Sequence, residues 1–268
     1  MTNIDTNSAC ITVAGDWHGN LQQALNVVNH AFQANCEVIL QAGDFGIWKG
    51  DTHFLDRLNE HLIANNQRLY FVDGNHENFP RLYSYPTDPD TGLRPIRSNI
   101  FHLPRALRFT IRGIRFLAMG GAYSVDRQWR KVNKSYWREE EVTEADIANA
   151  LAPEDRTTDV LLMHDSPYPA PNPITDNLSR QAEGMRFFGY EAISASNRHR
   201  NLLTPLFVAA QPRILIHGHY HEFWVGQHRH SSGMVTNVVA LDEGEAPLAE
   251  HAITLNLDDL KKEIDANS

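Results

Sequence analysis

The 268-residue sequence lacks the features of a membrane or secreted protein. Its longest apolar runs, such as VLLM and LFVAA, are far shorter than the roughly 20 apolar residues of a membrane-spanning helix. The N-terminal MTNIDTNSAC has no basic segment followed by an apolar one, so we expect no secretory signal. Two cysteines occur, Cys10 and Cys36, and we interpret them as buried thiols of a reducing compartment. We therefore expect a cytoplasmic protein with no membrane partner.

Positive charge is also scarce. The sequence has 24 Lys and Arg against 33 Asp and Glu, which gives a formal net charge of −9. Charge-driven binding to nucleic acid needs clustered Lys and Arg against phosphates. We therefore expect no stable nucleic-acid partner, although metal ions can still dominate the field of a local site. The sequence carries no signal for an oligomeric state.

The first 80 residues repeat one plan of strand, glycine turn and helix. Buried strands are predicted at Ala9–Ala14, Cys36–Gln41 and Arg68–Val72, because each is a short apolar run. Helical spacing of apolar residues begins at Leu21 and recurs across His53–Asn65. Alternation of this kind predicts a parallel sheet with crossover helices, and thus an α/β fold.

Later segments predict further strands and long loops. A helix is expected across Thr143–Leu151, with Thr143 as N-cap, and another across Asn201–Ala210. Residues 84–99 and the proline-rich YPAPNPITDNLS are expected to be loops, and residues 120–140 a long excursion on the substrate side. With no linker or repeat, we expect one domain over residues 1–268, with residues 1–8 as a flexible tail. Five further strands are predicted at Ile100–Leu103, Leu107–Ile111, Ile114–Met119, Met234–Leu241 and His251–Leu257, besides DVLLM and RILI.

Five polar clusters follow the ends of predicted strands, and their residue types are those of metal ligands. Sites in open α/β sheets form at the carboxyl ends of strands, so the clusters can converge. Asp, His and Asn supply the oxygen and nitrogen atoms that transition ions accept. Each cluster alone has a simpler interpretation as a turn, a buried histidine or a solvated strand end, but their conjunction favours a metal site. The clusters are Asp16-x-His18, Gly43-Asp44, Gly74-Asn75-His76-Glu77, His164 and Gly218-His219-x-His221.

In this order the clusters resemble the motif set of the calcineurin-like metallophosphoesterases. The resemblance runs from Asp16 to His221 and implies two packed mixed β-sheets flanked by helices, with two metal ions at the strand ends. The implied ligands form two groups joined by one bridging carboxylate. Asp16, His18 and His221 would hold the first metal, Asn75, His164 and His219 the second, and Asp44 would bridge them. The ions are expected to be Mn²⁺, with Fe, Zn²⁺ or Co²⁺ as alternatives.

The resemblance also implies hydrolysis of a phosphoester by metal-bridged hydroxide. His76, beside Asn75, is our candidate general acid for the leaving group, against the alternative of a purely structural histidine. The G-D-x-x-D-R-G motif of protein phosphatases is absent, because Asp44 is followed by FGIWK. This absence argues against a protein phosphatase and leaves the partner of His76 open, with Asp51 and Asp73 as weak candidates.

The 120–140 excursion resembles a module of bacterial and phage members of the family. Its aromatic and arginine side chains suit a nucleotide base and a phosphate, so we name four of them as candidate substrate-binding residues. The alternative is that the aromatic residues cover the core and the arginines are solvated. The four are Tyr123, Arg127, Trp129 and Arg130.

We therefore expect a phosphodiesterase that acts on small phosphodiesters, including nucleotide or cyclic-nucleotide esters. A phosphomonoesterase of broad specificity is the first alternative, and a nuclease, which the net charge disfavours, is the second. A binding module without catalysis is the least favoured, because all seven ligand positions and His76 are present.

Overall fold

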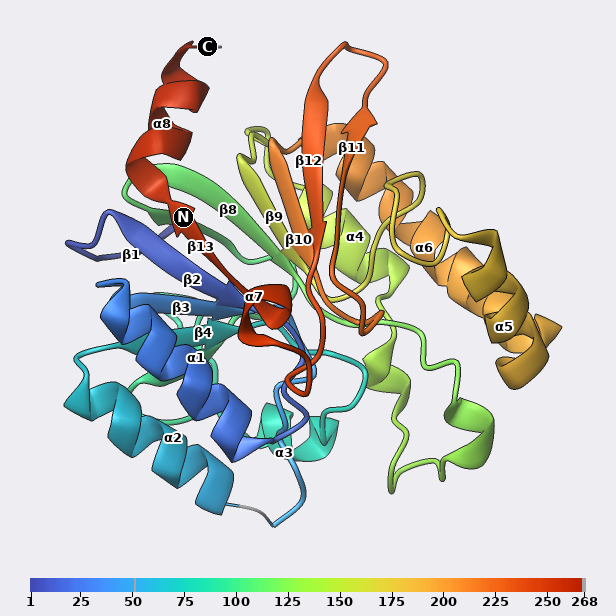
Figure 1. Ribbon diagram of the computed structural model, residues 1–268, viewed down its shortest axis with the longest axis horizontal. Coiled ribbons are helices and arrows are strands. Elements are labelled where there is room, and N and C mark those ends of the chain that lie inside the picture. The colour runs from blue at the N-terminus through green and yellow to red at the C-terminus, as the bar shows by residue number, and fades with distance from the viewer. Residues whose placement is uncertain (51, 267–268) are drawn as a thin grey trace.

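The computed structural model describes residues 1–50 and 52–266, which form two β-sheets packed face to face between helices (Figure 1). One sheet has the strand order β13-β2-β3-β4-β6-β5, and the other β1-β7-β8-β9-β10-β12-β11. Both sheets are mixed, with parallel strands at their centres and antiparallel pairs toward their edges. The α/β class with two packed mixed sheets is confirmed.

The element bounds are as follows. The first sheet contains β2 (Cys10–Ala14), β3 (Val38–Gln41), β4 (Arg68–Phe71), β5 (Arg94–Pro95), β6 (Ile100–His102) and β13 (Ala252–Asn256). The second contains β1 (Thr2–Ile4), β7 (Arg108–Ile111), β8 (Ile114–Met119), β9 (Val160–Met163), β10 (Ile214–His217), β11 (Trp224–Arg229) and β12 (Val235–Ala240). The helices are α1 (Leu21–Gln33), α2 (His53–Ala64), α3 (Phe79–Ser84), α4 (Glu144–Leu151), α5 (Leu178–Phe188), α6 (Tyr190–Ala210), α7 (Leu248–His251) and α8 (Leu257–Ala266).

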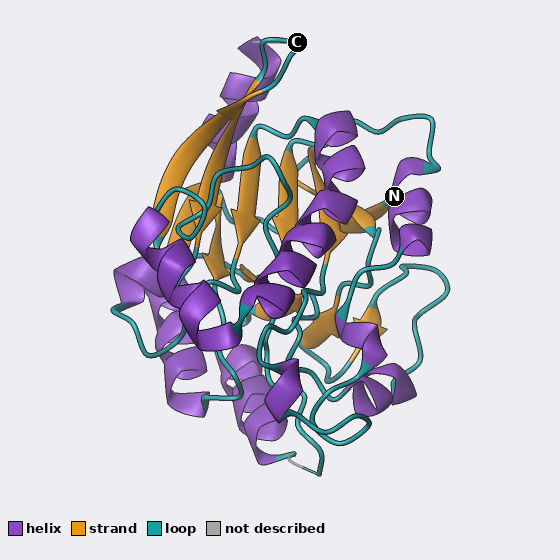
Figure 2. Cartoon of the chain, turned by 90° about the vertical axis from the view of Figure 1, so that its right-hand side faces the viewer, coloured by secondary structure: helices purple, strands orange, loops and turns teal. Residues whose placement is uncertain are grey.

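Three apolar clusters hold these layers together. The central cluster lies between the sheets and includes Val13 and Leu40 from one and Phe116, Leu162 and Ile216 from the other. A second cluster packs α1 and α2 on the outer face of the six-stranded sheet. A third packs α4 and α6 on the outer face of the seven-stranded sheet, and helices lie in front of its strands in Figure 2. Burial of apolar surface thus fixes four layers, in the order helix, sheet, sheet, helix.

Local signals set several element boundaries correctly. Thr143 caps α4, since its hydroxyl accepts from the backbone N–H of Asp146 while the Asp146 carboxylate accepts from Thr143.

The helix expected across Asn201–Ala210 begins earlier, at Tyr190, and contains Pro205 within it. Its additional turns bury residues such as His199 and Arg200, so tertiary packing compensates for the hydrogen bond that proline removes. Helix α5 escaped prediction because it buries none of its residues.

The N-terminus differs from the flexible tail expected over residues 1–8. Thr2–Ile4 form β1, which pairs in parallel with β7, and Ile4 is buried in the central cluster. The strand pairing with β7 and the burial of Ile4 hold residues 2–4 against the second sheet. Both cysteines are free thiols, as expected. No helix in the described part of the chain is long and apolar enough to cross a membrane.

Candidate metal centre

The ends of five parallel strands meet at one edge of the sandwich. In the six-stranded sheet, Asp16, Asp44 and Asn75 come shortly after β2, β3 and β4, which are neighbours. In the seven-stranded sheet, His164 and His219 come shortly after β9 and β10, which are also neighbours. The structure therefore brings together all five polar clusters seen in the sequence.

Four of the predicted ligands form a compact group. The ligand atoms of Asp16, His18, Asp44 and His221 all lie within 4.8 Å of one another. Nε2 of His221 lies 3.2 Å from Oδ2 of Asp16 and 3.2 Å from Nε2 of His18. Two imidazole nitrogens at this separation match two ligands that share an ion at about 2.1 Å each. The group fits the first of the two implied cations.

The second group centres on His164, which is fully buried. Its Nδ1 donates to the carbonyl oxygen of Ala42 at 2.8 Å, which leaves Nε2 to hold either a proton or a cation. Nε2 faces Oδ1 of Asn75 at 3.0 Å, while the amide nitrogen of Asn75 donates to Ser124. Two acceptors that face each other this closely require a proton or a cation between them. The His219 ring lies 5.1 Å from that of His164, between centroids.

Asp44 is placed to serve both groups. Its Oδ2 lies 3.8 Å from Nε2 of His18 and 3.5 Å from Nε2 of His164. Its Oδ1 accepts the backbone N–H of His76 at 2.7 Å. Although burial opposes ionisation, the neighbouring histidines, His164 foremost, hold the pKa of Asp44 well below its ordinary value. The side chain is therefore an anion, as a bridging carboxylate must be.

The histidines of the site differ in charge preference. Burial opposes protonation of His164, yet Asp44 and Asp16 raise its pKa to about 10. His221 is similar, because its contact with Asp16 outweighs burial and raises its pKa to about 9. Burial lowers the pKa of His219 to about 4, so its imidazole is neutral at pH 7. His164 and His221 thus occupy positions where the protein stabilises positive charge, which fits cations bound at these places.

Three glycines allow the ligands to approach the backbone. A Cβ atom on Gly74 would lie 2.0 Å from Oδ1 of Asp44, and one on Gly218 would lie 2.0 Å from Oδ1 of Asp16. A Cβ on Gly43 would lie 2.4 Å from Nδ1 of His164, and the φ of Gly43 is +101°. At Gly74 and Gly218 the requirement is space rather than a special backbone angle.

Two glutamates that support the ligands emerge from the structure. Oε2 of Glu243 lies 3.3 Å from Nδ1 of His221, on the side of the ring away from Asp16. Such a carboxylate orients a metal-binding histidine and raises its basicity. Glu77, in the same motif as Asn75, accepts the backbone N–H groups of residues 45–47 and so fixes the turn after Asp44. Glu243 follows no motif that the sequence displays.

His76 lies at the edge of this centre. Its ring is 5.4 Å from that of His18, between centroids, and burial lowers the pKa of His76. Among the described residues, no side chain forms a hydrogen bond with the His76 ring. Of its two candidate partners, Asp51 lies outside the described residues, and the carboxylate of Asp73 accepts hydrogen bonds from Arg105 instead.

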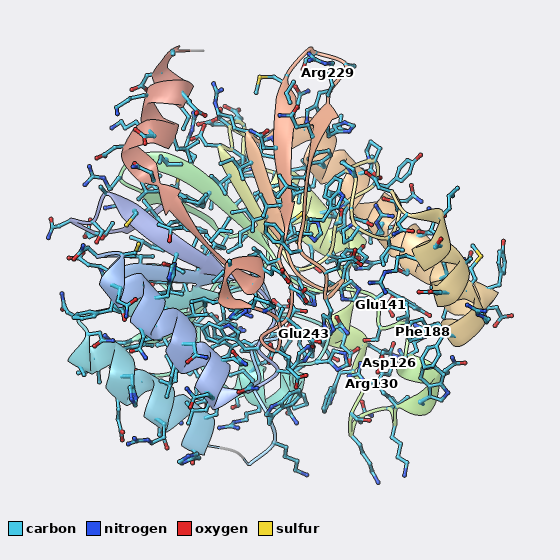
Figure 3. All side chains as sticks on the ribbon, in the orientation of Figure 1. Asp126, Arg130, Glu141, Phe188, Arg229 and Glu243 are labelled. Carbon is cyan, nitrogen blue, oxygen red and sulfur yellow. The ribbon has the colours of Figure 1, made fainter. Side chains whose placement is uncertain are left out.

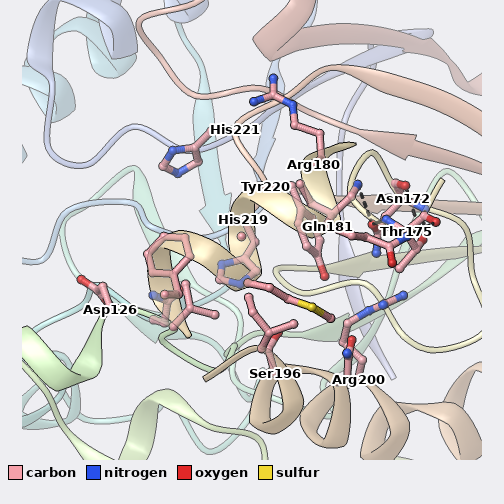
Figure 4. Close-up of a pocket in the computed structure, with 18 of the residues that line it drawn as sticks. Asp126, Asn172, Thr175, Arg180, Gln181, Ser196, Arg200, His219, Tyr220 and His221 are labelled. Atoms are coloured by element: carbon pink, nitrogen blue, oxygen red, sulfur yellow. Dashed lines mark hydrogen bonds between the residues drawn. The ribbon is translucent and has the colours of Figure 1, made fainter. Parts of the chain in front are cut away.

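A cavity of about 760 Å³ opens beside the ligands (Figure 4). Asp44, Asn75, His76, His219 and His221 form one part of its lining. Most of the remaining lining comes from the 168–201 segment, which includes the helix that sequence reasoning missed.

The four candidate substrate residues of the 120–140 excursion do not line this cavity in the described part of the chain. Tyr123 is buried under Arg127, whose guanidinium lies 4.3 Å from the ring centroid and also pairs with Glu141. Trp129 is 58% exposed and contacts the phenylalanines at the end of α5.

Arg130 has a supporting position rather than a place in the cavity wall. It pairs with buried Glu140 at 2.7 Å and donates to Ser124 and to the backbone of Asn75. Val125 and Asp126 of the same excursion do line the cavity, and Figure 3 shows Asp126 and Arg130 on the side of the molecule where Phe188 lies.

His217 lies two residues before His219 but is fully buried in β10, with its ring edge toward Tyr220. Burial lowers its pKa to about 4. A second pair of alternate histidines, His228 and His230, lies on and just after the edge strand β11, with the two rings in contact. Neither pattern joins the ligand groups.

Known proteins resemble the chain in sequence and in fold. The model of the calcineurin-like phosphoesterase family matches residues 11–223. A dimetal phosphatase from Danio rerio has 14% identity and a TM-score of 0.50 over 92% of each chain. A protein from Thermus thermophilus has 14% identity and a TM-score of 0.49 over 92% of this chain and 98% of its own. No curated protein sequence matches closely enough to count as a relative. Since the family match spans most of the chain, the protein belongs to the calcineurin-like phosphoesterase family and is a phosphoester hydrolase.

Proposed function

We propose that the protein is a dinuclear metal-dependent phosphodiesterase for small phosphodiesters, with nucleotide and cyclic-nucleotide esters as candidates. The observation that carries the proposal is the cavity of about 760 Å³ beside the candidate ligands. Ile174, Met185, Phe188 and Ile193 give it an apolar lining. Such a space suits a phosphoryl group that carries organic substituents.

Charge favours a diester over a monoester. Two divalent ions with the carboxylates of Asp16 and Asp44 would leave two net positive charges, which a diester monoanion and a hydroxide nucleophile balance. A monoester dianion would need a further cation nearby. Neither arginine among the described lining residues supplies this cation beside the candidate ligands. Arg180 pairs with Glu222 at 3.0 Å, and Arg200 lies across the cavity from His221 (Figure 4).

The implied metals fit the two ligand groups. We propose that the first ion binds among Asp16, His18 and His221 and the second among Asn75, His164 and His219, with Asp44 shared. When bound, the ions lower the pKa of water and neutralise charge on the phosphoryl oxygens. Mn²⁺ is our first choice, since three of the seven donors are carboxylate or amide oxygens, which suit manganese.

The protein's own residues orient these groups and handle the leaving group. Glu243 holds the His221 ring, the Ala42 carbonyl holds His164, and Ser124 holds the Asn75 amide. We propose that His76, which lines the cavity, donates a proton to the departing alkoxide oxygen from its protonated form, the minor form at pH 7 because burial lowers its pKa. We also propose that the protein belongs with the bacterial and phage members of the family, because residues 120–127 and 137–140 resemble a module of those members.

The proposed reaction is tested by restoring metal to stripped protein. We expect Mn²⁺ to restore hydrolysis of bis-p-nitrophenyl phosphate, with kcat/KM higher than for p-nitrophenyl phosphate, because the cavity favours a singly charged ester. A preference for the monoester would overturn the diesterase assignment. No metal-dependent hydrolysis of either ester would contradict a catalytic site of this kind.

The role of His76 is tested with leaving groups of different basicity. We expect His76→Ala to lower kcat/KM by about 10²–10³-fold for a methyl ester and by less than about tenfold for a p-nitrophenyl ester, since nitrophenolate departs unprotonated. His61→Ala, on α2 and remote from the cavity, is the matched control and should change neither value. Equal losses on both esters would indicate a structural role for His76.

A further inference from the structure

Two buried polar side chains line the cavity away from the candidate metal ligands. Asn172 and Arg200 lie to the right in Figure 4, whereas His221 and Asp126 lie to the left. Asn172 is 0% exposed and Arg200 is 4% exposed. They also belong to one local structure, because Nη2 of Arg200 donates to the carbonyl oxygen of Ala170 at 3.3 Å.

The amide of Asn172 presents an unused donor. Its Oδ1 accepts the backbone N–H groups of Ile174 and Thr175, each at 2.9 Å, and these two bonds fix the orientation of the amide. Its Nδ2 is buried and has no hydrogen-bond partner among the described residues. A buried donor without an acceptor is costly, so this position fits an oxygen atom of a ligand.

Arg200 adds a positive charge at the same place. Its Nε donates to the carbonyl oxygen of Ser166 at 2.9 Å, and the guanidinium forms no ion pair with a carboxylate of the described residues. Asp165 is near enough to interact electrostatically with Arg200, but its oxygens already accept from His199 and Tyr220. A buried guanidinium held by neutral carbonyl groups is suited to binding an anion.

Apolar residues complete the lining of the cavity. Ile174, Met185, Phe188 and Ile193 offer contacts to hydrocarbon or to a flat ring. An occupant that filled the cavity would therefore have a phosphoryl end, a partly apolar body and an oxygen-rich end.

We propose that Asn172 and Arg200 form a subsite for an anionic oxygen group, a carboxylate or a second phosphate, at the far end of the substrate. The substrate class is then a phosphoester whose organic arm is partly apolar and ends in an anion. The inference rests on the proposed function, because the candidate metal ligands must hold the phosphoester end.

The test uses non-hydrolysable phosphonates and needs no turnover. Calorimetry on the Mn²⁺-loaded protein compares an ω-carboxyalkyl phosphonate with the neutral ω-carbamoylalkyl phosphonate of equal length. We expect the acid to bind about 10- to 100-fold more tightly, as charge-assisted hydrogen bonds predict. If a bisphosphonate of the same length binds more tightly than the acid, the anionic group is a phosphate. If the acid binds more tightly than the bisphosphonate, the group is a carboxylate. Either result supports an anion subsite.

Asn172→Asp is the informative variant, because Arg200 also holds the backbone and its replacement endangers folding. The aspartate keeps an acceptor for Ile174 and Thr175 but places a negative charge where the amide donated. We expect affinity for the acid to fall at least tenfold, with affinity for the carbamoyl probe unchanged. Asn177→Asp is the matched control, since Asn177 caps α5 with its own Oδ1 and does not line the cavity in the described structure.

The outcomes separate this inference from the proposed function. Equal affinity of the wild-type protein for the acid and its amide would overturn the subsite and leave the phosphoesterase proposal intact. Failure to bind either phosphonate in the presence of Mn²⁺ would overturn both. The comparison within the wild-type protein requires no variant to fold.

Discussion

Backbone strain at single residues is concentrated in the candidate metal centre. His18, Asp44, His219 and His221 all have positive φ, at 46°, 51°, 72° and 49°. Non-glycine residues in this left-handed region cost roughly 1–3 kcal/mol each and persist only where the surrounding structure enforces them. Four such residues among seven predicted ligands indicate that side-chain direction has been favoured over a relaxed backbone, as a functional site requires.

At the same scale, Glu243 should determine how well His221 binds metal. We expect Glu243→Gln to weaken Mn²⁺ affinity by about 10- to 100-fold, because loss of a carboxylate behind a ligating histidine lowers its basicity. Mn²⁺ titration of the stripped protein measures the effect. Glu245→Gln, a nearby exposed glutamate, is the control and should leave affinity unchanged. Equal affinities in the two variants would show that Glu243 does not support the site.

The sequence revealed residues that act within motifs and hid those that act across segments. Asp16, Asp44 and His164 were visible because each follows a strand whose end can be predicted. Glu243 and Asn172 were not, since their contacts depend on where separate loops meet after folding. The ion pair of Arg130 was hidden for the same reason, because its buried partner Glu140 looks in the sequence like any acidic residue of a polar loop.

Among the elements, one arginine connects the six-stranded sheet to the 120–140 excursion. Arg105 follows β6 and donates from Nε and Nη2 to Asp73, which comes shortly after β4. The same guanidinium donates to the carbonyl oxygens of residues 139–141. Burial opposes ionisation of Asp73, yet Arg105 holds its pKa well below its ordinary value. This arrangement sets where the excursion meets the end of β4, close to Asn75.

We expect Arg105→Lys to lower the free energy of unfolding by about 3 kcal/mol. A lysine keeps the charge but cannot serve the carboxylate and several carbonyl groups together, so buried acceptors lose their donors. Urea unfolding followed by circular dichroism measures the change. Arg112→Lys is the matched control, since Arg112 pairs with the half-exposed Asp258 and should change stability by less than about 1 kcal/mol. A loss no larger than the control would mean that the excursion holds its place without Arg105.

Helices and strands were predicted well where their buried side chains recur at regular spacing in the sequence. Strand β8 has the predicted bounds, and α4 begins after its predicted cap. Helix α5 has no buried residue, and Leu178 and Phe187 are 82% and 69% exposed, so no stripe marks it. This helix and the start of α6 provide much of the cavity lining, so the cavity wall away from the candidate ligands was the least predictable part of the site.

At the scale of the molecule, the candidate metal centre joins the two sheets. Asp16, Asp44 and Asn75 extend from one sheet, and His164 and His219 extend from the other. The central apolar cluster holds the two sheets together below the strand ends. At the strand ends themselves, carboxylates and other hydrogen-bond acceptors lie close together. Cations bound here would hold the edge together, whereas in the metal-free edge the buried carboxylates of Asp16 and Asp44 are stabilised by neighbouring histidines.

Metal should therefore stabilise the whole fold, since the ligands meet only in the folded chain. With free Mn²⁺ at about 100 times its Kd, linkage to one site adds about 2.7 kcal/mol. For a chain of this size, that corresponds to a rise in Tm of roughly 5–10 °C over the EDTA-treated protein in a thermal scan. Asp44→Asn removes the shared anion, so we expect it to lose most of this rise while the metal-free protein stays folded. Asp90→Asn, an exposed loop residue, should keep the full rise. A wild-type Tm that is the same with EDTA and with Mn²⁺ would show that the strand ends do not bind the ion, whatever their geometry.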